Sequence, residues 1–112
     1  MTIQKITPKE LQKKLTEDSK LEILDVRADE KFQEFHIEGS KNIPKTVIFG
    51  LEETGEPLSL PKENEFIVTC TTGNSAAKCA NILDGLGYKV RVLEGGLTAW
   101  KEYKKHCEIK PE

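Results

Sequence analysis

The sequence predicts an α/β fold in which a mainly parallel sheet carries helices on both faces. Two runs, LEILDV at 21–26 and EFIVTC at 65–70, are apolar at both alternating positions, which is typical of central strands covered on both sides. Helical and strand-like segments alternate along the chain, and this order favours parallel strands joined by crossover helices. Ligands bind such sheets at the carboxyl ends of the strands, next to helix N-termini.

Two helices are expected around the first of these strands. In ITPKEL, Thr7 fits an N-cap and Glu10 the third position of a capping box, with a proline between them, so a helix is expected over 8–16. After the strand, ADEKFQEFH predicts a helix with acids in its first turn and with Phe32 and Phe35 facing the core. The following IEGSKNIP is expected to form a turn and a short extended piece.

The second half of the chain is expected to continue the alternation. Glycines and prolines interrupt 45–64, which predicts a loop with one helical turn near 47–51. Apolar residues recur at helical spacing over 76–83, and Gly87 is placed to end that helix. A third strand is expected over 88–93, and a glycine pair then leads into a last helix.

Composition excludes several classes of protein. The net charge of −2 argues against non-specific binding to nucleic acid or to an anionic membrane, and no apolar run is long enough to span a bilayer. The three cysteines are odd in number and form no CxxC pair, so neither a disulfide framework nor a zinc site is expected. With no secretory signal at the N-terminus, a reducing, cytoplasmic location is expected.

Cys70 stands at the end of the second strand, ahead of a loop of small polar residues and the next helix. A helix N-terminus offers unpaired N–H groups and a partial positive charge, which together stabilise a thiolate. A compact loop can curl so that its amides form an anion-binding nest around the sulfur. We therefore expect Cys70 to be catalytic and the loop to bind substrate. The loop residues are Thr71, Thr72, Gly73, Asn74 and Ser75.

The residue types alone leave other interpretations open. A free cysteine at a strand end can be a buried structural residue, and a nest can hold a phosphate, a sulfur oxyanion or a persulfide. Cys79 is expected to be an inert core thiol, and Cys107 to be exposed in a polar tail. Asp25 and Arg27 are expected to form a structural ion pair, and His36 to be structural.

Four segments, taken in order, resemble the rhodanese-like family. They are LEILDVR, FHIEGSKNIP, VTCTTGNSA and VRVLEGGLTAW, and they span nearly the whole chain. The resemblance implies a single rhodanese domain over 1–112, with a five-stranded sheet, as a whole protein or as a module of a longer one. It implies a sulfurtransferase in which Cys70 takes a sulfane sulfur from thiosulfate or a low-molecular-weight persulfide, holds it as a persulfide and passes it to a thiophilic acceptor.

The partners implied by this resemblance are a small sulfur donor, a thiol or protein acceptor, and fused or partner domains of sulfur metabolism. No metal and no cofactor are implied. Two further alternatives remain beside the enzyme. One is a sulfur-binding or regulatory module without turnover. The other is a related phosphatase or arsenate reductase, which would need an arginine at position 76, where this chain has alanine.

The loop departs from the family pattern in its charge. Many members carry basic residues just after the cysteine and at the end of the loop, where this chain has Thr71 and Ser75. A loop without charge should capture the thiosulfate dianion weakly and leave the backbone to hold the anion. We therefore expect a small or uncharged persulfide donor to be preferred over thiosulfate.

Overall fold

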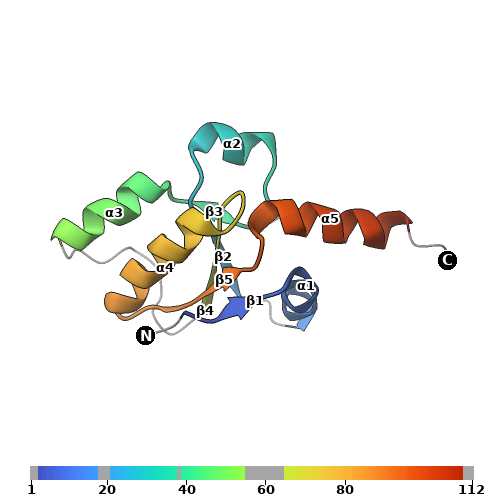
Figure 1. Ribbon diagram of the computed structural model, residues 1–112, viewed down its shortest axis with the longest axis horizontal. Coiled ribbons are helices and arrows are strands. Elements are labelled where there is room, and N and C mark those ends of the chain that lie inside the picture. Colours follow the sequence, from blue (N-terminus) through green and yellow to red (C-terminus); the bar gives the residue numbers. More distant parts are fainter. Residues whose placement is uncertain (1–2, 18–20, 38, 55–64, 110–112) are drawn as a thin grey trace.

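A parallel five-stranded sheet forms the centre of the protein (Figure 1). The computed structural model describes residues 3–17, 21–37, 39–54 and 65–109. Within these residues the strand order is β1-β5-β4-β2-β3, and every pairing is parallel. The strands are β1 (Lys5–Ile6), β2 (Glu22–Asp25), β3 (Lys41–Asn42), β4 (Glu65–Thr69) and β5 (Lys89–Leu93). The helices are α1 (Pro8–Glu17), α2 (Asp29–Glu34), α3 (Lys45–Thr54), α4 (Asn74–Gly85) and α5 (Gly96–Ile109). The expected fold class is confirmed, although β1 was not predicted.

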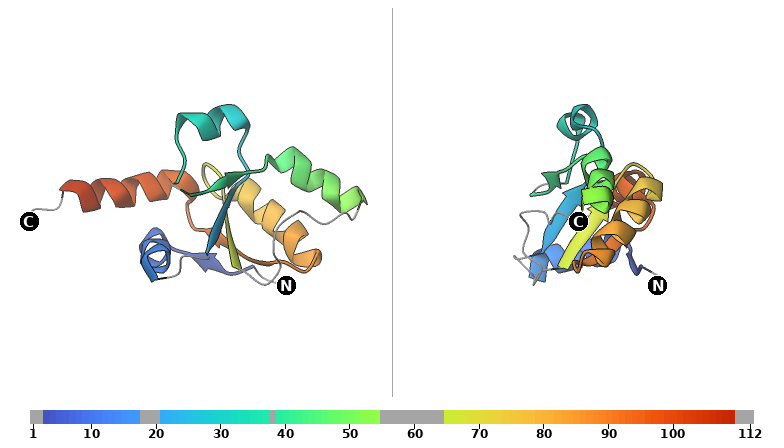
Figure 2. Two further views of the ribbon diagram at one scale, coloured as in Figure 1. Left: turned by 180° about the vertical axis from the view of Figure 1, so that it is seen from behind. Right: turned by 90° about the vertical axis from the view of Figure 1, so that its left-hand side faces the viewer.

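Helices cover both faces of the sheet, as Figures 1 and 2 show. Phe66 and Val68 of β4 pack in one buried cluster with residues of α3 and α4. Ile67, between them, packs in a second cluster with Leu11 of α1 and Trp100 of α5. Because successive side chains of a strand point to opposite faces, a strand covered on both sides is apolar at every position. This double burial explains the continuous apolar runs in the sequence.

The capping box at the start of α1 is formed as expected. Thr7 Oγ1 accepts a hydrogen bond from the Glu10 amide at 3.2 Å, and Glu10 Oε1 accepts one from the Thr7 amide at 3.0 Å. The bond from the Thr7 backbone, followed by that from its hydroxyl, lowers the pKa of the Glu10 carboxyl. Since the carboxylate is the acceptor, the cap is complete above the ordinary pKa of glutamate and is lost as pH falls through the lowered one.

The expectation that Phe32 and Phe35 face the core is wrong. No residue of α2 is buried, and Phe35, just after it, is 36% exposed. Figure 1 shows the reason, because α2 stands clear of the sheet beyond the carboxyl ends of the strands. The two rings are instead covered locally. Phe32 stacks on His36 with ring centroids 3.9 Å apart, and the Lys101 ammonium lies 4.8 Å from the Phe35 ring centroid.

The loop expected over 45–64 begins with a ten-residue helix, α3, where only one turn was predicted near 47–51. Ile48 is fully buried and Leu51 is 9% exposed, and both join the cluster on the α4 side of the sheet. Burial of one side stabilises the helix despite an internal glycine, which ordinarily lowers helix propensity. Residues 55–64 of the expected loop lie outside the described part of the chain.

The last two helices agree with the sequence pattern. Gly87 follows α4 with a positive φ of 97°, the conformation expected after a helix C-terminus. Leu97 and Trp100 are buried on one side of α5, which Figure 2 shows extending away from the sheet. None of the helices in the described ranges is long and apolar enough to cross a membrane.

Candidate active site

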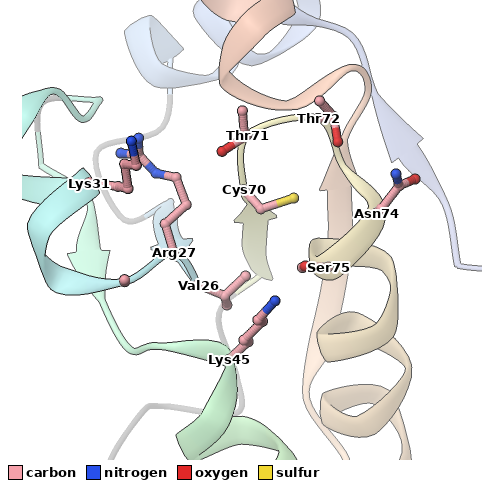
Figure 3. A pocket seen from close by; sticks show the side chains of 10 residues that line it. Val26, Arg27, Lys31, Lys45, Cys70, Thr71, Thr72, Asn74 and Ser75 are labelled. Carbon is pink, nitrogen blue, oxygen red and sulfur yellow. The ribbon is translucent and has the colours of Figure 1, made fainter.

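Cys70 follows β4 directly and lies at the carboxyl edge of the sheet. The end of the neighbouring strand β2 is held beside it, because the Val26 amide donates to the Thr69 carbonyl at 3.0 Å. Cys70 is 5% exposed and borders a pocket of about 400 Å³ (Figure 3). The thiol is therefore sheltered by the core and still reached from an open pocket, as a nucleophile must be.

Two backbone amides donate to the Cys70 sulfur. The Gly73 amide lies 3.0 Å from Sγ, and the Ala76 amide lies 3.3 Å from it. Gly73 is the N-cap of α4, with φ 103°, and has no side chain to cap the helix. Ala76 is the third residue of α4. The amide at this position ordinarily donates a hydrogen bond to the side chain of the N-cap residue, and here it donates to the Cys70 sulfur instead. This position at a helix N-terminus favours a negatively charged sulfur.

The N-terminus of α5 supports the loop from outside. The Leu97 amide donates to the Cys70 carbonyl at 2.9 Å, and the Thr98 amide donates to the Thr71 carbonyl at 3.0 Å. Gly96 makes this approach possible, because a Cβ there would lie 2.5 Å from the Cys70 carbonyl oxygen. With these two carbonyls held by α5, the Gly73 amide two residues further on points to the sulfur. Sequence reasoning missed this support, for which the glycine pair before the last helix is the signal.

The predicted loop residues divide between the pocket and the sulfur. Four of them line the pocket, and they are Thr71, Thr72, Asn74 and Ser75. Gly73 instead donates its amide to the sulfur, together with Ala76, which was not predicted. In the described part of the chain, no hydroxyl of the loop hydrogen-bonds the sulfur. The nest is therefore made of backbone amides, as the compact loop suggested.

The pocket is basic although the loop is not. Arg27, Lys31 and Lys45 line it together with the loop, and no carboxylate is among its described lining residues. The sheet brings these cations from three segments that end or begin at its carboxyl edge. The expectation that the backbone holds a bound anion considered only residues adjacent to Cys70 in sequence, and these cations add side-chain charge from other segments.

Comparison with known proteins shows the family of this chain. The model of the rhodanese-like domain matches residues 7–103. The chain belongs to the rhodanese-like family. It is 35% identical over 97 residues to the "Probable adenylyltransferase/sulfurtransferase MoeZ" of Mycobacterium tuberculosis, covering 85% of this chain and 24% of that protein. It is 30% identical over 102 residues to the "Putative sulfurtransferase YtwF" of Bacillus subtilis, covering 90% of this chain and 93% of that protein.

A solved structure agrees with the assignment. The rhodanese-like domain protein from Staphylococcus aureus is 31% identical and superposes with a TM-score of 0.75, covering 88% of this chain and 91% of that one. The chain thus spans about a quarter of the MoeZ protein and nearly all of two smaller relatives. The family match and the structural match each cover most of the chain.

In this rhodanese-like domain, Asp25 and Arg27 form the expected structural pair. Asp25 is fully buried, and the guanidinium meets it with Nε 3.0 Å from Oδ1 and Nη2 2.8 Å from Oδ2. Nη2 also donates to the carbonyl of Phe35. The side-chain Nδ2 of Asn42 donates to the backbone carbonyls of Asp25 and Arg27 at 3.0 and 2.9 Å. These bonds fix the β2 side of the pocket.

Arg27→Lys is expected to destabilise the protein by about 2 kcal/mol, because an ammonium cannot make the two parallel bonds to the buried carboxylate. Urea unfolding measures the change. Arg91→Lys is the matched control, since Arg91 Nε lies 3.0 Å from Glu65 Oε2 without hydrogen-bond geometry and both side chains are 29% exposed. The control should cost less than about 1 kcal/mol. Equal losses in the two variants would contradict the structural role of the buried pair.

Cys79 and His36 both lie outside the lining of the Cys70 pocket. Cys79 is fully buried, and burial raises the pKa of its thiol to about 11, with a further rise from Cys70 and a smaller opposing effect from Lys45. His36 Nδ1 lies 2.7 Å from the Phe32 carbonyl oxygen, and its ring does not line the Cys70 pocket. The Cys107 side chain lies outside the described part of the chain.

Proposed function

We propose that this protein is a sulfurtransferase that carries a sulfane sulfur as a persulfide on Cys70. One observation carries the proposal most directly. The Cys70 sulfur accepts hydrogen bonds from two backbone amides at the N-terminus of α4 and borders an open, basic pocket. The names of the relatives MoeZ and YtwF, both of which include sulfurtransferase, support the same activity.

In the first step the Cys70 thiolate attacks the outer sulfur of the donor. A new S–S bond forms on Cys70 while the S–S bond of the donor breaks, and its electron pair leaves with sulfite or with a thiolate. The outer sulfur of the new persulfide carries the negative charge. The loop is compact and the pocket open, so this charge can be held by amides at the helix N-terminus.

In the second step a nucleophilic acceptor attacks the outer sulfur of the persulfide. The S–S bond breaks, and the electron pair returns to the Cys70 sulfur, which the Gly73 and Ala76 amides stabilise as a thiolate. Cyanide serves as acceptor in an assay, and a small thiol or a protein thiol serves in the cell. The two steps make covalent catalysis of the ping-pong type.

The proposal includes the setting of the domain. Residues 1–112 act as one sulfurtransferase domain with no cofactor, which receives sulfur from a small donor and passes it to a thiol or protein acceptor. MoeZ, which is about three and a half times as long, combines adenylyltransferase and sulfurtransferase in its name. By analogy, a fused or partner domain of sulfur metabolism supplies the acceptor of this chain.

Thiosulfate or the persulfide of glutathione should add the mass of one sulfur atom to the protein, on the peptide that carries Cys70. Intact-mass and peptide mass spectrometry measure it, and excess cyanide should remove the added mass. Cys79 should stay unmodified because its thiol is buried and its pKa is about 11. No labile sulfur on Cys70 with either donor would rule out the transferase.

A further inference from the structure

The three cationic side chains that line the Cys70 pocket differ in whether they already have a hydrogen-bonded partner. Arg27 uses its guanidinium on Asp25 and on a backbone carbonyl, so its fork is already occupied. Lys31 and Lys45 are exposed, and neither forms any of the ion pairs found within the described ranges. An ammonium without an ion-pair partner at the border of a pocket is available to a bound anion.

Of the two lysines, Lys45 is the better held. Its amide donates to the Val26 carbonyl at 2.9 Å, which ties it to the end of β2. It begins α3, whose Ile48 is fully buried in the core cluster. Lys31 lies on α2, a six-residue helix in which no residue is buried. A cation on a fixed backbone loses less conformational freedom when it binds a ligand.

The Lys45 side chain is also aimed at the site. Figure 3 shows it rising from α3 into the pocket, on the side of Cys70 and Ser75. The positive charge of Lys45 also acts on the buried Cys79 thiol, because it opposes the rise in the pKa of that thiol. A donor whose outer sulfur meets Cys70 therefore has an anchored cation within the same pocket.

We propose that Lys45 is a specificity-determining residue that binds the anionic end of the sulfur donor. This inference rests on the proposed function and names the donor class, which is a sulfane sulfur compound with a negative charge on the part that leaves when the S–S bond breaks. Lys45 supplies from another segment the cation that the loop lacks. Thiosulfate, with its sulfonate end, and a persulfide with a carboxylate both meet this requirement.

The role of Lys45 follows from where the negative charge lies during the first step of sulfur transfer. The Cys70 thiolate bonds to the outer sulfur of thiosulfate, the S–S bond breaks, and sulfite leaves with the electron pair. The negative charge of the sulfonate end is present before the step and grows in the leaving sulfite. Lys45 thus acts on capture of the donor and on the departing anion, while the amides of the loop act on the sulfur of Cys70.

The test compares two persulfides that differ in the charge of their far end. The persulfide of 3-mercaptopropionate ends in a carboxylate, and that of cysteamine ends in an ammonium on a carbon chain of similar length. Single-turnover persulfidation of Cys70, followed by rapid quenching and mass spectrometry, isolates the first step from the acceptor. Thiosulfate is measured in parallel.

Lys45→Gln should lower the second-order rate about tenfold for thiosulfate and for the carboxylate donor, and change it less than about twofold for the ammonium donor. Lys45→Arg should restore most of the rate. Lys45→Glu should reverse the preference between the two persulfides. Lys89→Gln, the same charge change at the opposite edge of the sheet, is the control and should match the wild type.

Equal losses for both persulfides in Lys45→Gln, or no loss for either, would overturn the role of Lys45 while leaving Cys70 sulfur transfer intact. A charge-selective loss in Lys31→Gln in place of Lys45→Gln would do the same. Absence of sulfur on Cys70 in the wild type with all three donors would instead overturn the proposed function. The two failures are therefore distinct.

Discussion

Cys70→Ser is expected to lower sulfur transfer from thiosulfate to cyanide by at least about a thousandfold. A serine hydroxyl fits the same space and can accept hydrogen bonds from the Gly73 and Ala76 amides. However, it is not ionised at neutral pH, and no histidine or carboxylate among the described lining residues could deprotonate it. It also cannot form the S–S bond that stores the sulfur. Thiocyanate formation measures the loss, and thermal unfolding should show that the fold persists.

Cys79→Ala is the matched control for this substitution. Cys79 is fully buried on the core side of α4 and does not line the pocket. Its removal should lower stability by about 1–2 kcal/mol through a small cavity and leave the rate of the folded protein within about twofold. Full activity in Cys70→Ser, or loss of turnover in folded Cys79→Ala, would show that Cys70 does not carry the reactive sulfur.

The same Cys70 variants separate sulfur transfer from phosphate hydrolysis. A phosphatase of related fold needs a guanidinium at the end of its loop to clamp the transferred group, and position 76 is alanine. The guanidinium of Arg27 borders the pocket but is bound to Asp25 and to the Phe35 carbonyl. We expect no hydrolysis of an aryl phosphate by the wild type, and Cys70-dependent hydrolysis would revive the phosphatase alternative.

The parts of the fold that sequence predicted are those fixed by neighbouring residues. The capping box of Thr7 and Glu10 lies within four consecutive positions, and both of its bonds form. The β4–loop–α4 unit around Cys70 is similar, since a strand end, compact residues and a helix start already define where the amides lie. Local chemistry therefore sufficed to find the sulfur and to expect an amide nest around it.

The parts that sequence missed depend on packing between distant segments. Local periodicity shows that Phe35 can face one side of a helix, but not that α2 stands clear of the sheet. It likewise cannot show that the backbone bond from Lys45 to Val26 brings an ammonium to the Cys70 pocket. For this reason the sequence shows that the loop carries no charge, but it does not show that three cations from other segments line the pocket.

Gly96→Ala is expected to destabilise the protein by about 2–5 kcal/mol and to slow persulfidation of Cys70 about a hundredfold. Gly96 has a φ of 61°, where an alanine is strained, and its new Cβ would lie 2.5 Å from the Cys70 carbonyl oxygen and 2.6 Å from that of Thr71. Relief of this clash must move α5 or the loop. Either movement weakens the bonds from Leu97 and Thr98 that hold the two carbonyls.

The loss of rate follows because those carbonyls and the nest belong to one short loop. When the Cys70 and Thr71 peptides rotate, the Gly73 amide leaves its position 3.0 Å from the sulfur. The thiolate then loses a donor that acts both before and after sulfur transfer. Urea unfolding and single-turnover mass spectrometry, with the rate expressed per folded molecule, measure the two effects separately.

Gly85→Ala is the control, because Gly85 is helical and nothing lies within 4 Å of the position of its Cβ. That variant should be as stable as the wild type or more stable by up to about 1 kcal/mol, since alanine reduces the entropy of the unfolded chain. If Gly96→Ala lost stability but kept the wild-type rate of persulfidation per folded molecule, the sulfur would not depend on α5. The nest would then be set by the loop and α4 alone.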